Sequence, residues 1–240
     1  MDDPIWSPTT FSKNRNRLLD SDIASAVFDA VLRQSRETVL LSDEHFTVDG
    51  TLLEAWASLK GFPGKDEGPQ TPPDDPSTPI AIFHGESRRN DTHQSTTDPD
   101  RMLARKGAGR EAKLSYAGHV PLDNRHGLVA NVCVTPATGT AERDAAHLLL
   151  EASAPAGSTM GGTRLSMSQR SSLRRALGIT PHVAPKAVGT AIDGLTTRHS
   201  DYSISQVKRQ LLEQVFGRIK TVGGSRKLRH RGGANSSIGW

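Results

Sequence analysis

Two β-rich segments separated by five turn-forming residues constrain the fold of this chain most strongly. KLSYAGHVPL at 113–122 and LVANVCVTPA at 128–137 lie on either side of Asp123-Asn124-Arg125-His126-Gly127. Asp, Asn and Gly favour tight turns because they tolerate the backbone angles that a chain reversal requires. The pattern therefore predicts an antiparallel hairpin.

Helices and further strands are predicted on both sides of this hairpin. Thr140 can cap a helix that runs to about Ala152. Residues 20–34 place apolar side chains on one helical face, and residues 203–222 do so at four-residue intervals. HFTV, before the hairpin, and ITPHVA, after the Gly/Ser-rich stretch 155–172, are strand-like. This order predicts an α/β domain built on one sheet.

Two long stretches show no such periodicity. Residues 61–79 contain six of the fourteen prolines and three glycines, with too little apolar surface to order a segment. A long, flexible, Pro-rich insertion is therefore expected at about 61–80. Residues 84–112 are polar and have no helical or strand period, and the block around Asn90 to Asp100 is expected to form a loop near the sheet.

Charge is distributed unevenly along the 240 residues. Residues 1–100 carry a net charge of −9, residues 101–240 carry +13, and the whole chain carries +4. A basic surplus of this size attracts polyanions, of which nucleic acid is the first to consider. Aromatic residues make up 5% of the chain and do not interleave with the basic ones, so phosphate contact is favoured over base stacking. A solvated, frayed basic terminus is the simpler alternative.

Composition excludes several classes of protein. Cys133 is the only cysteine, which excludes a disulfide scaffold, a Cys-based zinc site and a CxxC redox motif. No apolar run reaches the length of about eighteen residues that indicates a membrane span, and the acidic start is unlike a signal peptide. We therefore expect a cytoplasmic protein with no membrane partner.

Two groups of residues could carry chemistry. Asp49 follows a strand-like segment and precedes Gly50, so its carboxylate is expected at a strand end, although Asp-Gly could simply turn the chain. Arg209, Glu213 and Lys220 lie within about 60° of one another on the last predicted helix. They could equally form an ordinary ion pair on a solvated helix face.

Six sequence blocks in a fixed order resemble a known family. They are HFTVDGTLLEAWASLKGF, FHGESRRNDTHQSTTDPD, GREAKLSYAGH, TPHVAP, AIDGLTTRHSDYSISQ and LLEQVFGRIKTVGGSRKLRHRG. Together with FSKNRNRLL, over roughly residues 8–233, they resemble bacterial DDE-type insertion-sequence transposases of the insertion-sequence-five group. The resemblance implies a ribonuclease-H-like mixed sheet with flanking helices, a bacterial cytoplasmic location, and DNA cleavage and strand transfer with two Mg²⁺ ions.

The resemblance also implies roles for single residues. Asp49 would be the first catalytic carboxylate and Glu213 the third, both as metal ligands, with Arg209 and Lys220 as the basic residues that accompany the glutamate. Gln206 stands where the family has a tyrosine. Two metal ions about 3.5–4 Å apart need oxygen ligands, one ion to activate the attacking group and one to stabilise the leaving oxygen. Two carboxylates alone supply too little negative charge for both ions.

The second aspartate of the family is missing. The family carries it in a block similar to LGADKAYD, where this chain has TMGGTRLSMSQ, and no acidic residue occurs between Glu151 and Asp193. Compensating frameshifts in the gene, near Gly161 and before Leu177, would account for the change. Codons that yield no Asp-Lys in either other frame would refute this hypothesis. We therefore expect a copy altered around 158–176, truncated at both ends and catalytically defective.

DNA binding is expected to outlast catalysis. Double-stranded DNA, as element ends and target, is the predicted partner, and its phosphates are expected to be held by Arg218, Arg226, Lys227, Arg229 and Arg231. The alternative is a non-catalytic DNA-binding remnant that interferes with intact transposases, as a homo-oligomer or in mixed assembly. The predicted organisation is a helical remnant at 1–42, the transposase domain at 43–222 and a basic tail at 223–240.

Overall fold

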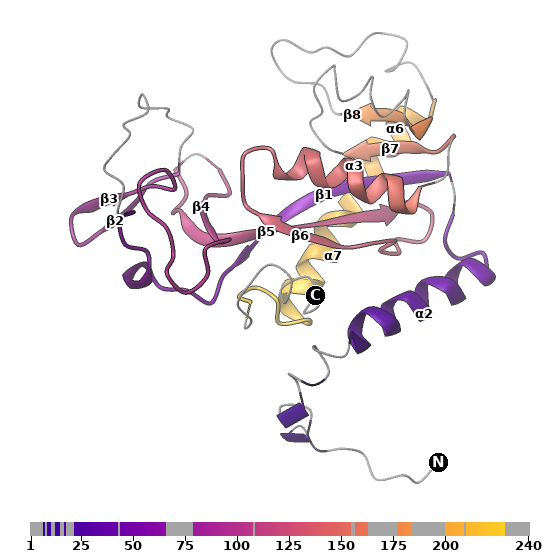
Figure 1. Cartoon of the computed structure of the whole chain (residues 1–240). Helices are drawn as coiled ribbons and strands as arrows, with labels where there is room; N and C mark the ends of the chain where they lie inside the picture. The colour runs from indigo at the N-terminus through magenta and orange to yellow at the C-terminus, as the bar shows by residue number, and fades with distance from the viewer. Residues whose placement is uncertain are drawn as a thin grey trace.

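The computed structural model describes twelve stretches of the chain. They are residues 7, 9–10, 13–14, 17, 22–42, 44–65, 79–107, 109–154, 157–162, 177–183, 200–208 and 210–228. These residues form a mixed sheet with helices on both of its faces (Figure 1). The prediction of an α/β chain built on a mixed sheet with flanking helices is confirmed.

The sheet in the described part of the chain has six strands. They are β1 (His45–Glu54), β4 (Met102–Ala104), β5 (Lys113–Asp123), β6 (Cys133–Pro136), β7 (Thr159–Gly162) and β8 (Thr180–Val183). Their order is β4-β5-β1-β7-β8, and β6 also pairs with β5. β5 is antiparallel to β1, β4 and β6, whereas β7 is parallel to β1 and β8 is parallel to β7. A separate antiparallel hairpin is formed by β2 (Ala81–Phe83) and β3 (Glu86–Arg88).

The hairpin predicted from the turn residues is confirmed. β5 and β6 pair antiparallel, from His119 opposite Cys133 to Tyr116 opposite Pro136. The Gly127 N–H donates to the Asp123 carbonyl at 2.9 Å, and Gly127 has φ 72°, an angle that favours glycine. Local turn chemistry thus decides this reversal of the chain.

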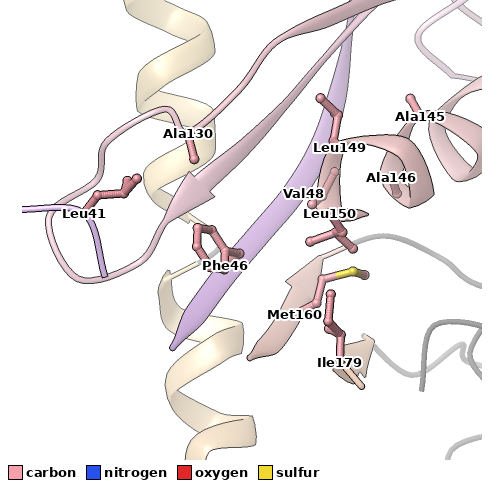
Figure 2. Packing of buried hydrophobic residues seen from close by; sticks show 10 residues of the cluster. All are labelled: Leu41, Phe46, Val48, Ala130, Ala145, Ala146, Leu149, Leu150, Met160 and Ile179. Carbon is pink, nitrogen blue, oxygen red and sulfur yellow. The ribbon is translucent and has the colours of Figure 1, made fainter. Parts of the chain in front are cut away.

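One face of the sheet is covered by α3 (Ala141–Ser153), which begins directly after Thr140 as predicted. Figure 2 shows Val48 of β1 beside Leu149 and Leu150 of this helix. Phe46 of β1 belongs to the same cluster, and all four side chains are at most 3% exposed. Burying each of these large apolar side chains stabilises the fold by about 1.5–3 kcal/mol. This cluster fixes α3 across the first half of β1.

The other face is covered by α6 (Ser200–Lys208) and α7 (Gln210–Thr221), which occupy the region predicted as one helix at 203–222. Leu212 and Phe216 of α7 pack on Val120 and Leu122 of β5. Val120 pairs with Asp49 and Leu122 with Thr47, so side chains of β1 at these positions also face α7.

The Gly/Ser-rich stretch predicted at 155–172 contains a strand, although its residues are poor strand formers. β7 pairs parallel to β1, with Gly161 opposite Thr47. A Cβ atom at Gly161 would lie 3.2 Å from the Thr47 Oγ1 and 3.4 Å from the Ser205 Cβ. A glycine is favoured here because Thr47 of β1 and Ser205 of α6 leave little room for a side chain.

The predicted N-terminal helix is confirmed as α2 (Ile23–Glu37). Three residues of its predicted apolar face are largely exposed, since Ile23, Val27 and Val31 are 44%, 59% and 53% exposed. The helix therefore adds little buried apolar area to the described fold.

The loop predicted around Asn90 to Asp100 is confirmed, and it is held between β3 and β4 by specific hydrogen bonds. The Asn90 side chain donates to the Leu103 carbonyl at 2.9 Å and accepts from the Leu103 N–H at 2.7 Å. The Tyr116 hydroxyl donates to the Asp98 carboxylate at 2.5 Å, and Arg101 lies 3.6 Å from the same oxygen. Asp98 and Arg101 are at most 3% exposed, so this network is part of the interior.

The insertion expected at 61–80 begins with ordered structure. Phe62 is 1% exposed and packs with Leu103 and Leu114, and Gly64 forms a bridge with His93. Residues 66–78 lie outside the described residues, so the expected flexibility stays a prediction there.

Candidate functional site

Asp49 lies in the middle of a strand, and the prediction that it ends one is wrong. β1 continues to Glu54 because β5 pairs with it without interruption, from Phe46 opposite Asp123 to Glu54 opposite Ser115. This long pairing overrides the turn preference of Asp-Gly. The half-buried Asp49 carboxylate accepts the Gly50 N–H at 2.8 Å.

Three contacts fix the direction in which the C-terminal helices cross β1. The Ser205 hydroxyl is 2.7 Å from the His45 Nε2 at the start of the strand. The Lys220 Nζ donates to the Thr51 Oγ1 at 2.6 Å, and the Leu228 N–H donates to the Glu54 carbonyl at 2.8 Å. The chain from α6 through α7 therefore runs along β1 in the direction of the strand.

This direction relates the sequence-predicted acids to each other. Glu213 is exposed on α7 and falls between Ser205, which contacts the start of β1, and Lys220, which contacts Thr51. Asp49 lies between His45 and Thr51 in β1. It is on the face of the sheet that α7 covers. The structure thus brings Lys220 to the strand of Asp49 and carries Glu213 on the helix that covers this face.

The metal-binding capacity of this region is limited in the described part of the chain. No group of three or more His, Cys, Asp or Glu side chains there could hold a metal ion. Asp49 and Glu213 carry carboxylate oxygens, the type of ligand that Mg²⁺ prefers.

Lys220 is the centre of a group of like charges. Its pKa is lowered, first by burial and then by the positive charges of Lys106 and Arg226. Lys106 lies in the loop after β4 and was not predicted from the sequence, because the polar segment around it has no period that would place it near α7. Lys106, Lys220 and Arg226 are hereafter the basic group. Lys106 and Arg226 each repel the Lys220 ammonium, and an anion such as phosphate beside Lys220 would offset this repulsion.

The other predicted DNA contacts differ in their surroundings. Arg218 is exposed on α7. The Lys227 Nζ is 3.8 Å from a Glu54 carboxylate oxygen and 5.1 Å from the Trp56 ring centroid, so its charge is already engaged. Residues 226–228 at the start of the predicted basic tail are bonded to the end of β1. The remaining predicted residues lie outside the described residues: Arg209, Arg229 and Arg231.

A cleft of about 830 Å³ lies on the opposite face of β1 and was not predicted. His119 is 1% exposed at its wall, and its Nε2 is 3.0 Å from the Thr135 Oγ1. Burial lowers the pKa of His119 to about 4, against the opposing effect of the Asp49 charge. The sequence gives no signal for this site, because its residues come from β1, β4, β5 and α3.

Comparisons with known proteins add no family assignment. No protein-family model, no curated protein and no solved structure matches this chain. The helices of the described residues also include none with the length and apolar character that crossing a membrane requires.

Proposed function

We propose that this chain descends from a DDE-type DNA transposase, binds double-stranded DNA through its phosphates, and lacks metal-dependent cleavage because one of three carboxylates has been lost. The topology supports a ribonuclease-H-like fold. Three antiparallel strands, β1, β5 and β6, are followed by α3, then by two strands parallel to β1, and then by helices on the other face. Fold alone does not determine function, so the proposed DNA binding and loss of cleavage are argued from the site residues.

The register of β7 against β1 is the observation that carries this proposal. Gly162, the last residue of β7, pairs with Val48, the residue before Asp49. The next residue in the sequence is Thr163, in the block where the related transposases have their second aspartate. The loss of that carboxylate leaves Asp49 and Glu213 to hold two cations alone, which is too little charge for a two-metal site.

The basic group supports DNA binding. Lys106, Lys220 and Arg226 raise the positive potential near the second half of β1, and burial strengthens the repulsion felt by Lys220. Phosphates of a DNA backbone would relieve this repulsion and release counterions. We infer that affinity for DNA is independent of base sequence and falls steeply with salt.

Restoring the missing carboxylate tests the metal site. Nicking of supercoiled plasmid in Mg²⁺ or Mn²⁺ is measured for the wild type, for Thr163→Asp and for the uncharged control Thr163→Asn. We expect nicking only by Thr163→Asp, and its loss when Asp49→Asn is added. Metal-dependent nicking by the wild type that Asp49→Asn abolishes would refute the loss of catalysis, and an inactive Thr163→Asp would count against the site assignment.

DNA binding is tested by fluorescence anisotropy with a duplex of arbitrary sequence. Lys106→Gln, Lys220→Gln and Arg226→Gln are each expected to reduce the slope of log K against log salt by about 0.9. Lys113→Gln is the control, because Lys113 lies 3.5 Å from Glu54 and 3.7 Å from Glu111 and its charge is balanced there. Equal slopes for all variants would refute phosphate contact by the basic group.

A further inference from the structure

Among the Phe, Tyr and Trp side chains that the structure describes, Trp56 alone is largely exposed, with 57% of its surface accessible. It follows the end of β1 and lies at the centre of a three-residue turn, in which the Ala57 N–H donates to the Ala55 carbonyl at 2.8 Å. The buried Arg101 side chain donates to the Trp56 carbonyl at 3.4 Å. The ring is therefore presented to solvent from an ordered turn.

The C-terminal segment places cations beside this ring. Glu54 forms a parallel bridge with Lys227, and the Glu54 N–H donates to the Arg226 carbonyl at 3.2 Å. The Lys227 Nζ lies 5.1 Å from the Trp56 ring centroid. An aromatic ring and basic residues therefore meet in the fold, although they are too far apart in the sequence for any interleaving of the two to be visible there.

The basic group lies within reach of the same stretch of DNA as Trp56. Lys220 contacts Thr51, which precedes Trp56 by five residues. A fully extended chain advances at most about 3.6 Å per residue, so the Cα atoms of Thr51 and Trp56 are at most about 18 Å apart. Duplex DNA advances about 3.4 Å per base pair, so Trp56 lies within about five base pairs of phosphates that contact Lys220.

The surroundings of Trp56 suit a base better than an apolar protein surface. Among the largely exposed large apolar side chains of the described residues, Trp56 is the only one between Leu40 and Ile80 in the sequence. The ring is flanked by charge instead, because the Glu54 carboxylate lies 3.8 Å from the Lys227 Nζ above it. Hot spots of protein interfaces lie in well-packed, desolvated surfaces, whereas a base stacks on a single aromatic ring beside cations.

We propose that Trp56 stacks on an unpaired base of a DNA duplex whose neighbouring phosphates are held by the basic group. The inference rests on the DNA binding proposed above and adds the class of substrate, a duplex that contains an unpaired base. Bases within an intact duplex already stack on both neighbours and offer no free face. More than half of the Trp56 surface is open, so the Lys227 ammonium covers only part of the ring and a base can occupy the rest.

Fluorescence anisotropy with the full chain tests this preference on two labelled duplexes with identical ends. One is fully paired and the other carries a single unpaired thymine in its centre. We expect about tenfold tighter binding to the second, at a ratio that changes little with salt because the two present nearly the same phosphates. Equal affinities would refute the stacking and leave DNA binding intact, whereas no binding to either duplex would refute the proposed DNA binding and this inference together.

Three variants locate the contact. Trp56→Ala is expected to abolish the preference and to keep the affinity for the paired duplex within about twofold of the wild type. Trp56→Phe keeps a smaller ring and is expected to retain part of the preference. Ile82→Ala, at another largely exposed apolar position, is the control and is expected to retain all of it. A preference that persists in Trp56→Ala would refute the site, and a changed oligomeric state of that variant in analytical ultracentrifugation would then assign the ring to a protein interface.

Intrinsic fluorescence provides a test that leaves Trp56 unchanged. The sequence contains three tryptophans, so Trp6→Phe combined with Trp240→Phe leaves Trp56 as the single emitter. Stacking on a base is expected to quench its emission, so the duplex with the unpaired thymine should cause a large loss of signal and the paired duplex a small one. Equal quenching by the two duplexes at saturation would contradict the stacking.

Discussion

The burial of His119 makes the stability of the fold depend on pH in a way that can be calculated. Burial lowers its pKa from 6.5 to about 4, because the interior disfavours the imidazolium. The unfolded chain therefore binds a proton at pH values where the folded chain does not, and stability is lost as pH falls from 6.5 to 4. At 1.36 kcal/mol per pH unit, the loss approaches about 3 kcal/mol at pH 4.

Urea unfolding at pH 7.5 and pH 4.5 measures this effect. His119→Gln removes the titrating ring but keeps a side chain that can bond to Thr135, so it is the matched variant. We expect the wild type to lose about 2–3 kcal/mol more than the variant between the two pH values. Asp49 and Glu142 lie near residue 119 in both proteins, so the difference between the two losses reports on the His119 ring. Equal losses in the two proteins would refute the burial of a neutral His119.

Two further predictions concern the interior. Tyr116→Phe removes the hydrogen bond to Asp98 and should lower the free energy of unfolding by about 1.5–3 kcal/mol in urea titrations. Because burial and Asp98 raise the pKa of Tyr116, wild-type stability should fall further as pH rises above 10, and the variant should lack this fall; an identical alkaline profile would contradict the network. Leu150→Ala should cost about 2–5 kcal/mol by thermal or urea unfolding, whereas Leu148→Ala, at a position 61% exposed, should change stability by less than about 0.5 kcal/mol. Similar losses at both positions would refute the packing of α3.

The elements predicted well from sequence are those that local chemistry decides. The turn at Asp123 to Gly127 reverses the chain because its residues favour that geometry, and α3 begins where Thr140 predicts. Even there, the Thr140 side chain makes no capping bond, so the helix is fixed by its apolar face more than by its cap.

The elements predicted poorly depend on partners distant in sequence. Asp49 continues a strand because β5 pairs along it, and no window around Asp49 contains that information. The bonds between Asn90 and Leu103 hold the predicted loop against β4, and its composition alone does not indicate them. The cleft at Gly50 and His119 likewise arises only when β1 and β5 pair in one register.

The roles proposed for single acids could be reached from sequence only through the family resemblance. The structure adds the placement of α7 and β7 beside β1, the strand of Asp49. The Lys220 contact with Thr51 fixes α7, and the pairing of Gly162 with Val48 fixes β7. Because Thr163 follows Gly162 in the sequence, it is the position at which we propose to restore a carboxylate.

A crystal structure of Thr163→Asp grown with Mn²⁺ tests the central claim most directly. The account predicts a metal ion within about 2.2 Å of a carboxylate oxygen of Asp49, with the new side chain or Glu213 as a further ligand. A metal ion bound elsewhere, or Asp49 and Glu213 too far apart to share a site of two ions, would contradict the assignment of these acids to a broken transposase centre.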